Sequence, residues 1–359
     1  MSNSIEIYRY LQEHLDKLPI GFPSTESGVE IRILKRLFTP DEAEIALKMN
    51  FEYESAEVIQ SRIERHNLTL EKINDLLTNM AKKGAITTSR MGDTTNYCLN
   101  VWIIGMYEYQ VNKLSKDFIQ DVSQYSNEAF STEFVTSAAK TSQFRVIPVE
   151  KSIPYKSEIA TYDQLRAVIE SVSPIAVANC ICRQRKDLEG QSCRSDLREV
   201  CMPFGSFAQH YIDHNIGRAI DKDEAMNLVR VAEKEGFVIQ AGNSQRPGFF
   251  CLCCGDCCGV LTGMKTLPRP IDFCSTNFHA EVDQELCSGC ETCLDRCQID
   301  ALTIIDDISN VNQDRCLGCG LCVSTCPEDA IHLSPNETIY TPPSDWKALY
   351  EIIASNKTK

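Results

Sequence analysis

Apolar residues recur at helical spacing in several stretches of the first half of the chain. We expect helices that begin near Thr39, Ser55 and Thr69, and the Thr39 hydroxyl can cap the first turn of the helix that follows it. The third helix ends at Gly84, and two strand-like runs then flank Arg90–Asp93. Its apolar stripe has three- and four-residue spacing and consists of Ile73, Leu76, Leu77 and Met80.

The second half of the chain shows the same kind of pattern in three places. One helix is expected from Gly205, and a second from Asp221 to Gly236, where glycine suits the left-handed C-cap. The apolar run FVIQA that follows predicts a strand. A last amphipathic helix is expected after Ser344, which we assign as its N-cap, with an apolar face that packs back onto the body of the protein. That face comprises Trp346, Leu349, Tyr350 and Ile353.

Composition describes a globular chain of two or three domains. The chain has 359 residues, of which 43% are hydrophobic and 24% are charged. No apolar run approaches the ~20 residues of a membrane helix, and the start of the chain lacks the basic and apolar regions of a secretory signal. The sequence therefore predicts a cytoplasmic protein without a membrane span. Its net charge of −14 disfavours nucleic acid or an anionic membrane as the main partner.

Cysteine changes this picture, since the chain holds 19 and they are unevenly placed. Only Cys98 lies in the first 179 residues, where its apolar neighbours predict a buried free thiol, and the other eighteen lie between Cys180 and Cys326. Thiols stay reduced in the cytoplasm, so this density indicates metal binding rather than disulfides.

The last eight cysteines form an internal repeat. VDQELCSGCETCLDRCQIDALTI begins at Val282, and VNQDRCLGCGLCVSTCPEDAIHL begins at Val311, 29 residues later. Both units read C-x2-C-x2-C-x3-C, in which three thiolates serve one cluster and the fourth serves the other. We expect one cluster on Cys287, Cys290, Cys293 and Cys326, and a second on Cys316, Cys319, Cys322 and Cys297.

Glycine and proline positions support the repeat, with one departure. Gly289 and Gly318 lie inside the loops, where we expect backbone N–H groups to approach cluster sulfur and a side chain to obstruct them. Pro327 follows the last cysteine of the second unit, whereas Gln298 takes that place in the first. The segment from Glu281 to Pro335 resembles a bacterial-type ferredoxin with two [4Fe–4S] clusters, which implies low-potential one-electron transfer. The alternative for this repeat is a pair of structural zinc sites. Zinc sites prefer CxxC pairs separated by a longer spacer, so the spacing favours iron–sulfur clusters.

Ten cysteines between Asn179 and Phe278 have no standard spacing. We predict metal binding here, with Cys274 the least certain member of the set. One or two further iron–sulfur clusters, an unusual cluster beside one cubane, or zinc would each fit. The Cys-Cys-Gly pairs resemble the motif of heterodisulfide reductase catalytic subunits, although the surrounding spacing differs. The predicted metal ligands are Cys180, Cys182, Cys193, Cys201, Cys251, Cys253, Cys254, Cys257 and Cys258.

Other polar residues of the middle segment leave their roles open. His210 and His214 are four residues apart on one helix, and we interpret them as partly exposed histidines rather than ligands. Arg183 and Arg185 lie beside the first cysteine pair, where they either stabilise cluster charge or are simply solvated.

The N-terminal part, with three helices and a two-stranded wing, resembles a winged helix-turn-helix domain. DNA binding requires a concentrated basic face, whereas the third helix carries Glu71 and Asp75 against Lys72. A protein-interaction or structural role is therefore favoured over nucleic-acid recognition.

Taken together, the chain resembles multi-domain 4Fe–4S binding proteins of anaerobes. We expect an α+β protein with a winged-helix-like domain at 1–120, a cysteine-rich α/β middle at 121–278, a ferredoxin domain at 279–335 and a C-terminal helix at 336–359. The leading hypothesis is an electron carrier or an electron-transfer subunit of an oxidoreductase. The alternatives are an iron–sulfur redox-sensing regulator and a reductase with a substrate-binding middle cluster. Between Glu281 and Ser334 eleven acids and two bases give a charge of −9, which indicates either a solvated acidic surface or a docking site for a redox partner with a basic docking face.

Overall fold

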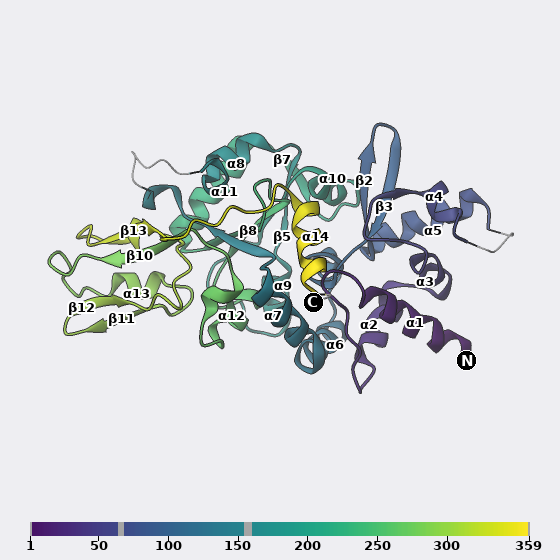
Figure 1. Cartoon of the computed structure of the whole chain (residues 1–359), viewed down its shortest axis with the longest axis horizontal. Coiled ribbons are helices and arrows are strands. Elements are labelled where there is room, and N and C mark those ends of the chain that lie inside the picture. Colours follow the sequence, from purple (N-terminus) through teal and green to yellow (C-terminus); the bar gives the residue numbers. More distant parts are fainter. Residues whose placement is uncertain (1, 64–67, 154–159, 358–359) are drawn as a thin grey trace.

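The chain is laid out along one long axis, with the N-terminal helices at one end and the cysteine repeat at the other (Figure 1). The structure is a computed structural model that describes residues 2–63, 68–153 and 160–357. No helix of these residues is long and apolar enough to cross a membrane.

Short helices and a hairpin form the first part of the N-terminal body. Thr39 caps α3 in a reciprocal capping box with Glu42, and Gly84 ends α5 with φ of 78°. The helices and hairpin expected between Thr39 and Leu99 are present, whereas the first two helices were not anticipated. The elements are α1 (Ser2–Leu15), α2 (Val29–Leu37), α3 (Pro40–Ala46), β1 (Glu54–Ser55), α4 (Ala56–Gln60), α5 (Leu70–Lys83), β2 (Ile86–Met91) and β3 (Thr94–Leu99).

Two helices lead from this body into the middle of the chain. They are α6 (Lys116–Tyr125) and α7 (Ser131–Lys140). The expected boundary at residue 120 falls inside α6, whose buried Phe118, Val122 and Tyr125 belong to the N-terminal hydrophobic core. The N-terminal body therefore extends at least through α6.

A six-stranded sheet of order β4-β8-β9-β6-β5-β7 forms the middle. Its neighbouring strands all pair antiparallel, so this part is an antiparallel α+β layer rather than the α/β arrangement we expected. The strands are β4 (Phe144–Ile147), β5 (Ile175–Asn179), β6 (Glu199–Pro203), β7 (Arg218–Ile220), β8 (Val238–Gly242) and β9 (Phe249–Cys253). The helices are α8 (Leu165–Ser171), α9 (Ile181–Leu188), α10 (Gly205–Asp213), α11 (Lys222–Glu235) and α12 (Gly259–Lys265).

The cysteine repeat folds as two strand pairs. Strand β10 (Phe278–Val282) pairs with β13 (Ile331–Pro335), and β11 (Leu302–Ile305) pairs with β12 (Ile308–Val311). Each unit places a short helical turn before its fourth cysteine, as α13 (Thr292–Arg296) and a 3₁₀ turn at Val323–Thr325. Because β10 precedes the repeat and β13 ends it, the first pair joins both ends of the segment.

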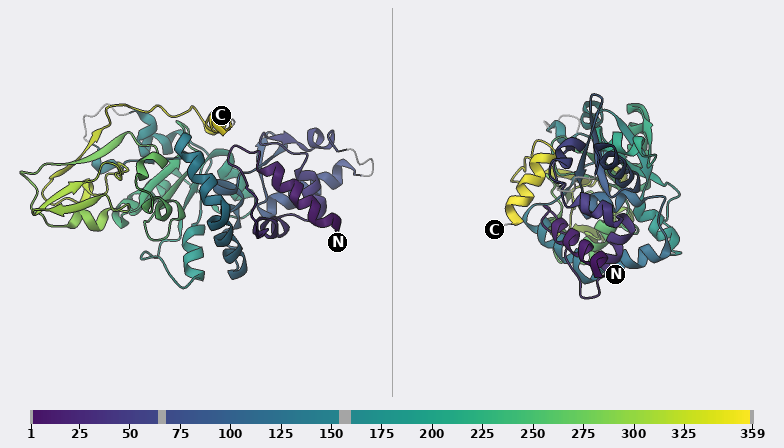
Figure 2. Two further views of the ribbon diagram at one scale, coloured as in Figure 1. Left: turned by 60° about the horizontal axis from the view of Figure 1, so that its bottom comes forward. Right: turned by 90° about the vertical axis from the view of Figure 1, so that its right-hand side faces the viewer.

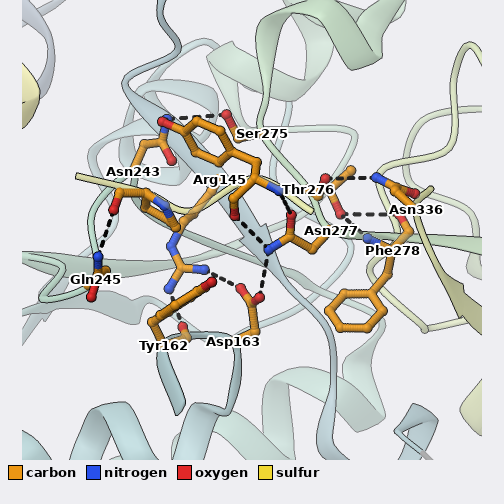
Figure 3. Close-up of polar contacts among 12 residues, drawn as sticks. Arg145, Tyr162, Asp163, Asn243, Gln245, Ser275, Thr276, Asn277, Phe278 and Asn336 are labelled. Atoms are coloured by element: carbon orange, nitrogen blue, oxygen red, sulfur yellow. Dashed lines mark hydrogen bonds and ion pairs between the residues drawn. The ribbon is translucent and has the colours of Figure 1, made fainter. Parts of the chain in front are cut away.

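This segment shares a hydrophobic core with the sheet. Ile299, Leu302, Leu317 and Leu321 are buried in the same cluster as Val238 and the other sheet residues. A buried ion pair between Arg145 of β4 and Asp163 adds a polar anchor, since Asn277 donates to the Asp163 carboxylate over 2.8 Å (Figure 3). The sheet and the repeat therefore form one body.

The chain after β13 returns along the molecule to α14 (Trp346–Lys357), the yellow helix near the centre of Figure 1 and at the upper edge of the left view in Figure 2. Leu349, Tyr350 and Ile353 are buried in the N-terminal core, as the amphipathic pattern predicted. Asp345 caps the helix by accepting from Ala348 N over 3.0 Å, so our assignment of Ser344 as the cap was wrong by one residue.

Candidate metal centres

The eight cysteines of the repeat line two separate cavities. One is lined by Cys287, Cys290, Cys293 and Cys326. The other is lined by Cys297, Cys316, Cys319 and Cys322. Each cavity thus draws three thiols from one unit and the fourth thiol from the other unit.

Backbone amides point at sulfur in both cavities with the same symmetry. Ala301 N and Ala330 N donate to Cys297 Sγ and Cys326 Sγ over 3.2 and 3.3 Å. Ser309 N and Ala280 N donate to Cys287 Sγ and Cys316 Sγ, each over 3.4 Å. Each donor lies 29 residues from its counterpart. Four thiols and aligned N–H donors are what a [4Fe–4S] cluster requires, so these residues fit that group.

Gly289 and Gly318 hold the cysteine loops in a conformation that other residues resist. Their φ angles are 67° and 61°. A Cβ on Gly289 would collide with Asp307 O, and one on Gly318 would collide with Phe278 O. Neighbouring backbone carbonyls, in addition to the left-handed φ, therefore require glycine at both positions.

Six of the middle cysteines form a connected chain of thiols. Cys201 of β6 lies opposite Cys251 of β9, and Cys253 lies two residues further along the same strand. Hydrogen-bonding contacts run from Cys180 to Cys182 and onward through the rest of the set. We call this the six-thiol group: in order of contact it is Cys180, Cys182, Cys258, Cys253, Cys251 and Cys201.

Three other cysteines gather with a carboxylate in a second group. Ligand atoms of Cys193, Cys254, Asp256 and Cys257 all lie within 4.8 Å of one another, and we call them the Cys3Asp group. Cys193 Sγ and Cys254 Sγ are 3.5 Å apart. Asp256 was not among our predicted ligands, although its place inside Cys254-x2-Cys257 was a signal for it. Thiolates with one carboxylate suit zinc or an iron–sulfur cluster.

The vicinal cysteine pairs are divided between the two groups. Cys253 and Cys258 belong to the six-thiol group, whereas Cys254 and Cys257 belong to the Cys3Asp group. The loop between β9 and α12 therefore supplies ligand candidates to both.

Arg183 lies between these groups rather than in solvent. It is buried, its guanidinium stacks 4.2 Å from the Phe237 ring, and it donates to Leu252 O over 3.3 Å. Burial by itself lowers the pKa of Arg183, but the nearby Cys254, Cys180 and Cys193 raise it overall, and its guanidinium donates to Cys254. A fixed positive charge at this place stabilises negative charge on both groups.

Gln298 connects the repeat to the middle cysteines. Its side chain is buried and its Oε1 accepts from Gly255 N over 2.8 Å, between Cys254 and Cys257. A Cβ on Gly255 would collide with Gln298 O, so the two backbones touch. The residue that replaces proline in the first unit therefore seats the Cys297 loop against the Cys3Asp group.

Four further residues lie apart from these groups. Cys98 and Cys274 are buried, and burial raises the pKa of the Cys274 thiol to about 12. We expected partly exposed histidines on α10, but His210 is buried against Tyr109, and its Nδ1 accepts from Thr88 N over 3.1 Å. Burial holds the pKa of His210 well below its usual range. His214 is half-buried and shares the Thr88 hydroxyl, so the pair bonds to the hairpin.

Comparison with known proteins identifies the C-terminal segment. Residues 280–333 match a protein family described as a 4Fe-4S dicluster domain. No curated protein matches the chain. The C-terminal segment thus binds [4Fe–4S] clusters, and the cysteine-rich middle is compatible with more. Together these features indicate iron–sulfur electron transfer.

Proposed function

We propose that the protein is an electron carrier, or an electron-transfer subunit of an oxidoreductase, that connects an external one-electron partner to metal centres in its middle. In the repeat, Cys287, Cys290, Cys293 and Cys326 would hold the outer cluster, and Cys297, Cys316, Cys319 and Cys322 the inner one. The clusters supply reversible one-electron chemistry.

The observation that carries this proposal is the contact between Gln298 and Gly255. It brings the loop of Cys297 against the loop of Cys254 and Cys257, while Arg183 links the Cys3Asp group to the six-thiol group. Thiol sites therefore follow one another from the exposed Cys290 to the interior. Burial of intermediate sites and exposure of the terminal one is the arrangement an electron relay needs.

The chain's own residues set the electrostatics of this relay. The four backbone N–H donors in the repeat and the buried Arg183 favour extra negative charge on the sites that they face. The inner site is the more enclosed of the two in the repeat, since Cys316 and Cys322 are buried and Cys290 is exposed.

The N-terminal body is proposed to be structural rather than DNA-reading. The hairpin is tied to α10 through Thr88 and through an ion pair of 2.8 Å between Arg90 and Asp213. These contacts use the hairpin to hold the N-terminal body against α10, and exposed Glu71 and Asp75 on α5 oppose phosphate.

Metal analysis of the anaerobically purified full-length protein tests the proposal. Two [4Fe–4S] clusters account for about eight irons, so further clusters in the middle raise the content to about twelve to sixteen with matching sulfide. Cys254→Ser should lower the iron content without removing the repeat's clusters, whereas the matched control Cys98→Ser should not change it. Eight irons accompanied by zinc would contradict an iron–sulfur relay through the middle.

A further inference from the structure

A narrow cavity lies at the inner end of the six-thiol group, where three distant parts of the chain meet. Cys201 and Cys251 form part of its wall, and Glu108 and Tyr109 of the N-terminal body form another part. Helix α14 closes it with Trp346 and Tyr350. The two cysteines are the last two thiols of the contact chain, so the cavity adjoins a candidate metal centre directly.

The cavity walls favour a flat molecule. They are largely apolar and rich in aromatic rings, and the space is narrow, with little room for the centre of a water molecule. Trp346 contacts Tyr350 and Phe207 with ring centroids 4.9 and 5.7 Å apart, and Tyr109 lies 5.4 Å from Tyr211. Such rings bind a planar, conjugated body better than a bulky or charged one.

The side-chain amide of Gln143, in the cavity wall, can donate a hydrogen bond that it does not make to any described residue. Gln143 is 3% exposed, and its Oε1 accepts from the Tyr350 hydroxyl over 2.7 Å. Its Nε2 has no hydrogen-bond partner among the described residues. A buried amide donor without an acceptor costs about 1–3 kcal/mol, which a ligand oxygen in the cavity would recover.

We propose that this cavity binds a flat conjugated carbonyl compound, with its oxygen accepting a hydrogen bond from Gln143 Nε2 and its ring plane between the aromatic walls. The inference deepens the proposed function and rests on it, since a reducible ligand at this place gives the relay an interior terminus. It also accounts for the return of the C-terminal segment, because α14 supplies two of the walls.

Binding of a matched pair of compounds to the full-length holoprotein tests the inference. The probes are 1-indanone, a flat aromatic ketone, and indane, which lacks the oxygen, titrated anaerobically with ligand-observed NMR. Gln143→Met removes the donor at nearly constant volume. We expect this change to weaken 1-indanone about tenfold, the effect of one neutral hydrogen bond, and to leave indane unchanged.

The possible outcomes distinguish a failure of the cavity proposal from a failure of the proposed electron relay. Unchanged indane affinity in Gln143→Met shows that the cavity is intact, so an equal loss for both compounds, or no loss for either, would overturn the proposed carbonyl contact. Failure of both compounds to bind a protein with its full iron content would reject the cavity as a ligand site and leave the relay standing. An iron content limited to the repeat would count against the relay itself.

Discussion

The direction of each cysteine side chain determines which thiols lie in the same cavity or group. In the repeat, the fourth cysteine of each unit faces the other unit's cavity, and in the middle, neighbouring cysteines in the sequence belong to different groups. The cavity or group to which a cysteine belongs therefore follows the direction of its side chain and not its nearest neighbour along the chain.

The crossed arrangement predicts a specific pattern in double variants. Cys297→Ala and Cys319→Ala remove ligands from the same cavity, so the double variant should lose about four irons, as each single variant does. Cys290→Ala with Cys297→Ala should lose about eight, because the two cysteines serve different cavities although they share a loop. Iron analysis of the three single and two double variants checks this. The reverse pattern would place all four ligands of a cluster in one unit.

The role of Gln298 can be tested with a single substitution. Gln298→Leu leaves the buried Gly255 N–H unpaired, which should cost about 1–3 kcal/mol at the contact between the repeat and the Cys3Asp group. We expect faster bleaching of the visible absorbance in guanidinium under anaerobic conditions. Gln284→Leu, at an exposed position of the repeat, is the matched control. Equal bleaching rates in the two variants would mean that the contact does not hold the domains together.

At the level of helices and strands, the sequence predicted the features that depend on residues close together in the chain. The capping residues Thr39 and Thr69 and the terminal Gly84 fix helices through their own first and last turns, and the 29-residue repeat fixes the cysteine loops. The sheet could not be predicted in this way, because β4 pairs with β8 almost a hundred residues away. Helices α1 and α2 were missed, and α2 begins after Gly28 without the side-chain cap that marks α3 and α5.

The middle site was predictable only in part. The period of two along a strand places Cys251 and Cys253 on one face of β9, but Cys201 joins them only through the pairing of β6 with β9. Asp256 was overlooked because we considered thiols alone. The role of Gln298 depends on a contact between segments that the spacing of cysteines does not report.

The loops of the repeat give a prediction about backbone geometry. Gly318→Ala would place a Cβ against Phe278 O at a residue with φ of 61°, so we expect loss of the cluster held by that loop, about four irons. Gly263→Ala is the control, since Gly263 lies in α12 with no atom near its added Cβ and alanine favours a helix. Iron content and absorbance of both proteins decide the matter. Full iron in Gly318→Ala would show that the loop can relax around a side chain.

At the scale of the whole molecule, the acidic repeat forms one end of an elongated body, far from the N-terminal helices (Figure 2). All eleven of its acidic residues are exposed, and Glu291 and Glu328 border the outer cavity beside the exposed Cys290. Under the proposed function, a redox partner that docks at this end would meet this concentrated negative surface.

This surface should make reduction by a cationic donor depend on salt. The Debye length falls from about 30 Å at 0.01 M to about 8 Å at 0.15 M ionic strength, so attraction between exposed charges weakens over that range. We expect stopped-flow reduction by the methyl viologen radical cation to slow as salt rises. Glu291→Gln with Glu328→Gln should reduce that dependence, because these carboxylates lie closest to the outer cluster site, whereas Glu13→Gln on α1 should not. The reduced radical of a bis-sulfonate viologen carries a net charge of −1, so its rate should rise with salt, whereas an effect of salt on the clusters themselves would move both donors the same way. Rates with methyl viologen that stay flat across this range would show that the acidic face is a solvated surface without a docking role.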